Sequence, residues 1–349
     1  MGGGLLQLVA YGAQDVYLTG NPQITFFKVV YRRHTNFSME SIQQTFNGTG
    51  SRITAQISRN GDLLHKLYLV FKDIDAKAPK VSFGHELIKK VEIEIGGQLI
   101  DRQYGEWMNI WNELTLPSGK KTGFHQMIDG KNGTKDVYVP LEFWFCRNIG
   151  LALPLIALQY HEVKLNVEFE NINGVNIPTP ELWADYVFLD TDERRRFAQM
   201  SHEYLIEQVQ FTGSNQISNK QHKLSFNHPV KFLAWAAPDA TFGTYKALGS
   251  AKLQLNGNDR FAERPADYFS LVQPYQHFSN IPSENIYVYS FALKPEEHQC
   301  SGSLNLSRID SASLNVDPAS AANGDLNIYA VNYNVLRILS GMGGLAYSN

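Results

Sequence analysis

The sequence contains little cysteine and no excess of either charge. Two cysteines among 349 residues, Cys146 and Cys300, are too few for a disulfide framework or for a metal site built from cysteine alone, which favours a reducing compartment. The 31 lysines and arginines nearly balance 34 aspartates and glutamates, and the net charge is −3. This balance gives no electrostatic reason to expect direct contact with nucleic acid.

Long hydrophobic runs are missing too. The longest apolar stretch, residues 149–158, is too short to span a bilayer and contains Pro154. The N-terminus lacks the basic residues that open a signal peptide, and Gln7 interrupts its apolar run. We therefore expect a chain that is soluble when it is made.

Motifs that identify an enzyme are missing as well. None of the 10 histidines forms an HExxH pair or the His-x-His pair of a two-domain cupin. His161–Glu162 and His202–Glu203 look suggestive, but adjacent side chains in a strand face opposite ways and cannot share an ion. The stretch 117–123 lacks two residues that a phosphate loop needs, so we interpret it as a solvated loop. We expect no metal, no cofactor and no catalytic residues.

What the sequence has in abundance is alternation of apolar and polar residues. It occurs in short stretches that are separated by clusters of Gly, Pro, Asn and Asp. Many short strands with turns between them indicate an antiparallel β-sandwich. The predicted half-buried strands cover residues 66–74, 91–95, 162–170, 203–211, 230–235, 286–293 and 303–309.

One hairpin motif occurs twice. VEIEIGGQLIDR, residues 91–102, alternates and then turns at Gly96–Gly97. AKLQLNGNDRF, residues 251–261, alternates and then turns at Asn256–Gly257. A copy of the same hairpin at two places in one chain suggests that a larger unit has been repeated.

Each hairpin precedes a short helix with an aromatic face. In the first helix, the residues spaced i, i+3, i+4 and i+7 are apolar, and Pro117 with Gly119 ends it. In the second, Pro265 suits the first turn and Pro274 is expected to stop the helix. The two apolar faces consist of Trp107, Ile110, Trp111 and Leu114, and of Tyr268, Leu271 and Val272.

A second internal sequence repeat follows the repeated hairpin in both halves of the chain. Residues 153–167 and 302–316 match weakly, and both end in Leu-Asn-Val. Because both repeats occur in the same order in the two halves, they favour the duplication of a single all-β domain. The boundary is expected near residues 190–202, where Arg194–Arg196 is interpreted as part of a solvated linker.

Residues near the N-terminus carry a specific resemblance. The stretches LLQLVAYGAQDVYLTGNPQITFFKVVYRRHTNFSMESIQQTF (5–46) and NVLRILSGMGGLAYSN (334–349) resemble the two ends of the major capsid proteins of nucleocytoplasmic large DNA viruses. Residues 146–169 and 226–235 resemble internal parts of the same family, so the match runs nearly from end to end. The N-terminal pattern consists of Gly12, Gln14, Asp15, Leu18 to Pro22, Thr25 to Phe27, and Tyr31 to Phe37.

The resemblance implies an all-β fold of two tandem eight-stranded antiparallel jelly rolls, a double jelly roll, with short helices in the loops. It divides the chain into an N-terminal arm (1–20), a first jelly roll (21–195) and a second jelly roll (196–349). It also implies a structural subunit, a major capsid protein whose homotrimers form pseudo-hexagonal capsomers that tile an icosahedral shell. The expected location is the virion, after synthesis in the host cell cytoplasm.

The resemblance also implies partners. These are other copies of the chain, minor capsid and penton proteins, and an internal viral membrane. The arm is expected at the inner side of the capsid, where its apolar segment and nearby arginines are candidate contacts for minor proteins or membrane. Ordinary packing of the first strand is the alternative. The candidate contact residues are Leu5, Leu6, Leu8, Arg32 and Arg33.

Two further interpretations stay open at this point. Asn47 and Asn132 stand in sequons and are candidate glycosylation sites, although a plain asparagine in a turn is favoured without a signal peptide. The alternative functions are a two-domain β-sandwich carbohydrate-active enzyme and a glycan-binding protein that uses exposed aromatics such as those in residues 274–278.

Overall fold

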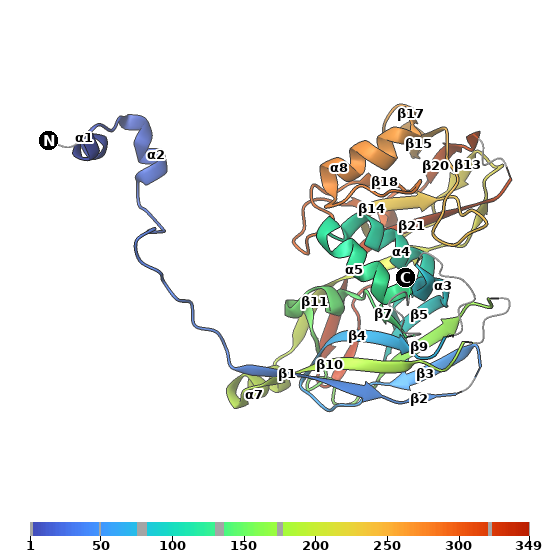
Figure 1. Cartoon of the computed structure of the whole chain (residues 1–349), viewed down its shortest axis with the longest axis horizontal. Helices are drawn as coiled ribbons and strands as arrows, with labels where there is room; N and C mark the ends of the chain where they lie inside the picture. The colour runs from blue at the N-terminus through green and yellow to red at the C-terminus, as the bar shows by residue number, and fades with distance from the viewer. Residues whose placement is uncertain are drawn as a thin grey trace. The chain divides into compact units, whose positions relative to one another are not determined.

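The computed structural model describes residues 3–48, 50–74, 82–129, 136–172, 177–319 and 323–348. The chain forms two compact units, Met1–Asn36 and Phe37–Asn349. The first unit contains α1 (Gly3–Val9), a 3₁₀ turn (Ala13–Asp15) and α2 (Val16–Thr19), and its described residues build no core of their own. The second unit contains every strand that the described residues form (Figure 1).

The first half of the second unit is a sandwich of two antiparallel sheets. One sheet has the order β1-β10-β4-β7 with β8 paired to β4, and the other has the order β2-β3-β9-β5-β6. Alternating apolar side chains of both sheets meet in the core between them, as sandwich packing requires. The strands are β1 (Phe37–Gln44), β2 (Phe46–Asn47), β3 (Arg52–Gln56), β4 (Leu63–Phe71), β5 (Ile88–Ile95), β6 (Gln98–Tyr104), β7 (Val137–Pro140), β8 (Leu153–Pro154), β9 (Val163–Phe169) and β10 (Glu181–Leu189).

The second half is another sandwich with its own core. One sheet has the order β11-β21-β14-β18, with β12 and β22 paired to β21 and β19 paired to β14; the other has the order β13-β20-β15-β16, with β17 paired to β15. The strands are β11 (His202–Phe211), β12 (Asn215–Gln216), β13 (Gln221–Lys223), β14 (Pro229–Ala236), β15 (Ser250–Leu255), β16 (Asn258–Asp259), β17 (Arg264–Pro265), β18 (Tyr287–Ser290), β19 (Leu304–Asn305), β20 (Ala312–Asp317), β21 (Asp325–Leu339) and β22 (Met342–Leu345).

The two sandwiches share one topology strand for strand. β1-β10-β4-β7 corresponds to β11-β21-β14-β18, and β3-β9-β5-β6 corresponds to β13-β20-β15-β16. The two Leu-Asn-Val segments lie at equivalent positions of the two sandwiches. Leu165 of β9 pairs with Ile93 of β5, and Leu314 of β20 pairs with Leu253 of β15. The structure thus bears out the repeated unit. The number of eight strands per roll stays a prediction, since two-residue strands at the sheet margins make any number depend on where a strand is taken to end.

Both hairpin turns have the backbone that their residues favour. Gly96 and Gly97 have φ of 59° and 81°, and Asn256 and Gly257 have φ of 49° and 78°. Two successive positive φ values define the type I′ turn, whose twist matches that of the strands it joins and which Asn-Gly and Gly-Gly adopt with little strain. The turns at both positions therefore fix the register of β5 with β6 and of β15 with β16.

The helix after the first hairpin is α4 (Gly105–Thr115), as predicted, and the one after the second runs on further than predicted. A π-helical turn (Tyr268–Val272) leads directly into α8 (Gln273–His277). Pro274 does not stop it: the proline lies directly after the π-helical turn, in the first turn of α8, and the helix continues to His277.

Two other local predictions were wrong. Residues 117–123 begin α5 (Ser118–Asp129), whose Lys121 is paired with Glu113 of α4 at 2.7 Å. In residues 303–309 the strand β19 stops at Asn305, whose side chain accepts a hydrogen bond from Ser307 and starts a 3₁₀ turn (Leu306–Arg308). Arg194–Arg196 are exposed, as expected of a solvated linker, and the linker is helical: they belong to α7 (Thr191–Gln199), where acidic residues in the first turn and Arg196 in the last suit the helix dipole. The remaining short helices are α3 (Phe83–Glu86), α6 (Trp144–Arg147) and a 3₁₀ turn (Ile149–Leu151).

Replacing Gly97 by alanine should lower the free energy of unfolding by about 1–2 kcal/mol, because an alanine at positive φ is strained. A new Cβ would meet no atom within 4 Å, so the backbone alone carries the cost. Gly119→Ala is the matched control: the site is equally open but lies in helix α5, where alanine should raise stability by roughly 0.5–1 kcal/mol. Chemical denaturation of both variants tests this; a loss at neither position, or at both, would refute the turn assignment.

Candidate assembly surfaces

The described residues contain no constellation for metal chemistry. No three of their His, Cys, Asp or Glu side chains lie together as ion ligands, and none of the helices they form is long and apolar enough to cross a membrane. His161 bonds through Nδ1 to the backbone of Gly343, and His202 bonds through Nε2 to the carbonyl of Phe197. Both histidines of the suggestive His-Glu pairs therefore serve packing.

The most extensive apolar contact outside the two sandwich cores joins the sandwiches to each other. Helix α4, which follows β6 of the first sandwich, lies between the two halves and covers the outer face of sheet β11-β21-β14-β18 (Figure 1). Ring centroids of Trp107 and Tyr329 are 5.4 Å apart, and those of Trp111 and Phe232 are 6.3 Å apart. We call this contact the α4 interface; it contains Trp107, Ile110, Trp111 and Leu114 of α4, and Val209, Phe232, Ala234, Ala236, Tyr245, Phe278, Ile286, Val288, Tyr329 and Val331 of the second sandwich.

This covering explains why β18 and all of β14 after Pro229 are buried, although their sequences predict half-buried strands. One face of β14 contacts the core of its own sandwich and the other contacts α4. Complete burial of each large apolar side chain stabilises by about 1.5–3 kcal/mol, so the α4 interface is a substantial part of the stability of the chain.

Polar contacts fix the angle at which α4 lies. Glu106, in the first turn of α4, accepts hydrogen bonds from Tyr329 Oη at 2.7 Å and from Asn327 Nδ2. One turn later, Asn109 donates to Tyr245 Oη at 3.2 Å. Burial raises the pKa of Glu106, although both donors act against the shift. These bonds give the apolar contact a single orientation.

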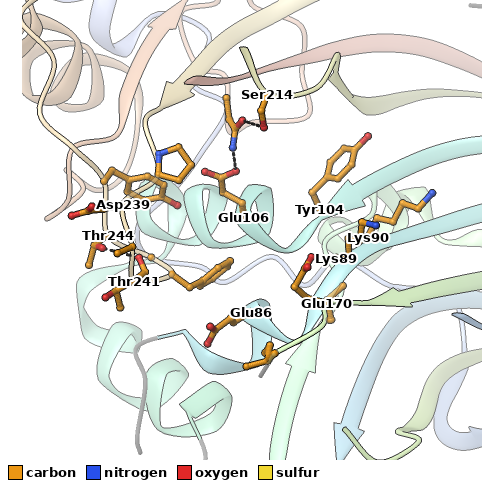
Figure 2. A pocket seen from close by; sticks show the side chains of 18 of the residues that line it. Glu86, Lys89, Lys90, Tyr104, Glu106, Glu170, Ser214, Asp239, Thr241 and Thr244 are labelled. Atoms are coloured by element: carbon orange, nitrogen blue, oxygen red, sulfur yellow. Dashed lines mark hydrogen bonds between the residues drawn. The ribbon is translucent and has the colours of Figure 1, made fainter. Parts of the chain in front are cut away.

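A hollow of about 650 Å³ opens beside Glu106, between the two sandwiches (Figure 2). Its rim carries Glu86, Lys89 and Glu170 from the first sandwich and the loop 238–245 from the second, so charges of both signs line it. Glu106 accepts a hydrogen bond from Asn327, whose Oδ1 in turn accepts one from Ser214 Oγ; Figure 2 labels Glu106 and Ser214. The buried carboxyl is thus engaged in holding the α4 interface.

A buried cluster of charges crosses the same junction. Lys231 of β14 has no exposed side-chain surface, and its Nζ lies 2.7 Å from Glu207 Oε1 on β11. Arg147, from α6 of the first sandwich, reaches the other carboxylate oxygen at 3.1 Å and lies 4.6 Å from the ring centroid of Trp111. Burial alone would raise the pKa of Glu207, but Arg147, His298 and Lys231 together lower it to about 2. None of the sequence patterns described above predicts this cluster.

A signal for it exists in the sequence. Lys231 is flanked by apolar residues throughout VKFLAW, and Glu207 interrupts the apolar stretch of its strand. A charge in a strand that is apolar on both faces needs a buried partner. Spacing alone does not say that the partners lie on different strands, or that Arg147 comes from the other half.

The remaining predicted site residues lie apart from this junction. Leu5, Leu6 and Leu8 are exposed on α1, and Arg32 and Arg33 are exposed in a segment without regular structure. Asn47 is the exposed last residue of β2, and Asn132 lies outside the described residues. Of the aromatics in residues 274–278, Tyr275 is exposed and Phe278 is buried in the α4 interface. The roles of the arm residues and of both sequons stay predictions.

Comparison with known proteins identifies the family. Residues 25–190 match the model described as "Major capsid protein N-terminus", and residues 193–344 match "Large eukaryotic DNA virus major capsid protein". The major capsid protein of Pyramimonas orientalis virus is 54% identical over 398 aligned positions, with all of both chains covered. The chain belongs to the major capsid proteins of large eukaryotic DNA viruses.

Solved structures agree with this assignment. The chain is similar to the subunit in the quasi-atomic model of the PBCV-1 virus capsid, with a TM-score of 0.86, 41% identity, and coverage of 93% of this chain and 100% of that one. The Faustovirus major capsid protein shares the fold, with a TM-score of 0.75 at 12% identity and 94% coverage of each chain. The expected double jelly roll is confirmed.

The family settles the class of function. This major capsid protein is a structural subunit of the capsid shell of the virion and, like its relatives, is not an enzyme. The alignment with the major capsid protein of Paramecium bursaria Chlorella virus 1, at 45% identity, is 437 positions long for a chain of 349 residues. That relative therefore carries insertions that this chain lacks.

Replacing Glu207 by glutamine should destabilise the protein by about 3–5 kcal/mol, because Lys231 and Arg147 would remain buried without their carboxylate. Glu203→Gln is the control, since Glu203 lies on the same strand but its pair with Arg337 is exposed. Since the folded pKa of Glu207 is depressed, its contribution is complete above the ordinary value of 4.5 and is lost as the pH falls toward about 2. Denaturation between pH 6 and pH 2 should show a smaller acid loss in the variant; equal losses would contradict the assignment.

Proposed function

We propose that three copies of the chain close into a capsomer of nearly hexagonal outline. The observation that carries this proposal is the pair of sandwiches with one topology and one order of strands. A homotrimer of a single-domain subunit has three equivalent walls, whereas a trimer of this chain has six similar ones. Hexagonal blocks tile a surface without gaps, which is what a large shell needs.

The proposed division of the chain is an arm of residues 1–20, a first jelly roll of residues 21–195 and a second of residues 196–349. In this arrangement each sandwich supplies one wall, and the paired strands make the wall stiff. Contacts within the trimer are proposed to be large and apolar, as in obligate oligomers, and contacts between trimers to be smaller and more polar. Penton proteins at the vertices and minor capsid proteins beneath the shell complete the set of partners.

The N-terminal arm is proposed to contact minor capsid proteins or the internal viral membrane. The support is an exposed apolar segment at Leu5, Leu6 and Leu8 and a basic pair at Arg32 and Arg33. An apolar helix face together with basic side chains is the combination by which peripheral segments bind anionic lipid.

Light scattering of the purified protein should give three times the chain mass of 39.4 kDa. Electron microscopy of the concentrated trimer should show hexagonally packed sheets. A protein that remains monomeric at all concentrations would contradict the trimer, and trimers that never pack laterally would contradict the tile.

Arm variants should separate assembly from attachment. Deletion of residues 1–20, or Arg32→Glu with Arg33→Glu, should leave the trimer intact and weaken its sedimentation with vesicles of phosphatidylcholine and phosphatidylserine. Each basic contact near such a surface contributes about 1 kcal/mol, so the double charge reversal should reduce binding at least tenfold. Arg308→Glu, an exposed site in the second sandwich, is the control. Unchanged vesicle binding would refute membrane attachment through the arm.

A further inference from the structure

Helix α8 with its preceding π-turn is the structural counterpart of α4. Each follows the repeated hairpin of its own sandwich. When the two helical segments are aligned so that Met108 corresponds to Phe269, Asn112 corresponds to Gln273. All four side chains are buried. Met108 and Phe269 each join the core of their own sandwich. The two helices thus dock on their own sandwich with the same face.

The opposite faces also correspond, but their surroundings differ. In the same alignment, Trp107 corresponds to Tyr268, Ile110 to Leu271, Trp111 to Val272 and Leu114 to Tyr275. The α4 residues are buried in the α4 interface. Leu271 is 51% exposed, Val272 39% and Tyr275 76%. Among the described residues of Phe37–Asn349, the second sandwich therefore presents an apolar helix face that is largely uncovered.

The surface that would receive this face has a counterpart as well. The strand pairing of the two sheets shows which residues are equivalent. The pair Tyr68–Trp183 of the first sandwich corresponds to the pair Ala234–Tyr329 of the second. The pair Lys66–Asp185 corresponds to the pair Phe232–Val331. On the second sandwich these positions lie under α4. On the first sandwich, the outer face of β1-β10-β4-β7 shows half-buried Tyr68 and Trp183, with Tyr138 exposed beside them.

We infer that α8 of one chain docks on the outer face of sheet β1-β10-β4-β7 of a second copy, in the orientation that α4 adopts within the chain. This inference rests on the proposed trimer and names its contact surfaces. The α4 interface is head-to-tail, since a helix of the first sandwich meets a sheet of the second. Repetition of a head-to-tail contact generates a ring when the rotation closes. The α4 and α8 contacts would then alternate around that ring.

The receiving face is more polar than the face under α4, which suits a surface that meets solvent before assembly. Lys66 and Asp185 stand where Phe232 and Val331 stand in the second sandwich. Tyr68 and Trp183 stack with ring centroids 6.5 Å apart, and Trp183 Nε1 donates to Glu181. Charged side chains beside the aromatic pair keep the unassembled sheet from indiscriminate association.

A disulfide cross-link tests the pairing directly. Trp111 lies against Phe232, and their counterparts are Val272 and Lys66. In a chain with Cys300→Ser, the double variant Val272→Cys with Lys66→Cys should form covalent dimers and trimers on oxidation of the assembled protein. The matched control keeps Val272→Cys and moves the second cysteine to Lys164, on the other sheet of the first sandwich, where no cross-link should form. Non-reducing electrophoresis reads out both variants.

The outcomes separate this inference from the proposed function. Trimers that cross-link through positions 272 and 66 support both. Trimers that fail to cross-link there, or that cross-link equally well in the control, overturn the inference and leave the trimer standing. A chain that is monomeric before oxidation overturns both. Leu271→Glu gives a second reading: it should raise the concentration at which the trimer dissociates at least tenfold with an unchanged melting profile of the monomer, and an undisturbed trimer would overturn the inference.

Discussion

The docking of helix α4 on the second sandwich is the contact on which the rest of the chain depends. Its two tryptophans lie on a sheet face of the second sandwich that would otherwise be exposed. The junction also includes Ile206, Leu336 and Ile338 of the second half, which pack into the core of the first sandwich. Glu106 and Asn109 fix the angle of the helix, and the Arg147–Glu207–Lys231 cluster joins the same two halves beside it. Apolar burial supplies the stability of this junction, and the polar groups supply its orientation.

Because the sandwich is duplicated, the docking of a helix on a sheet can be repeated between chains. Both sandwiches carry a helix at the same place after the same hairpin, and both carry a sheet with the same order of strands. Within the chain, only the first helix meets a partner sheet among the described residues. Helix α8 and the outer face of sheet β1-β10-β4-β7 have no such contact among the described residues, and both expose apolar or aromatic side chains. The face under α4 is mainly apolar, whereas the corresponding face of the first sheet carries Lys66 and Asp185. This difference suits a contact made during folding in the first case and one made during assembly in the second.

Much of this architecture could be predicted from the sequence, because its signals are local. Alternation located β4, β5, β9, β11, β14 and β18, and the Gly-Gly and Asn-Gly pairs located both hairpins. The spacing of Trp107, Ile110, Trp111 and Leu114 located α4 and its apolar face. The terminal motifs identified the family, and the comparisons agree with them.

What the sequence analysis missed depends on contacts between distant residues. Helix α5 begins at a Pro-Ser-Gly-Lys stretch typical of a loop, and Lys121 gains its partner Glu113 only in the folded chain. The complete burial of β14 depends on α4, and Lys231 is tolerated there only because Glu207 and Arg147 reach it from other elements. Alternation describes one strand at a time and carries no information about what covers its second face.

We infer that one docking geometry is used twice, once within the chain and once between chains. An electron cryo-microscopy map of the assembled capsomer at side-chain resolution tests this. When α4 is superposed on α8, β14 and β21 should fall on β4 and β10 of the neighbouring chain, and Val272 should lie against Lys66 of that chain. A capsomer in which α8 faces solvent, or in which the first sheet meets a different element, would contradict it.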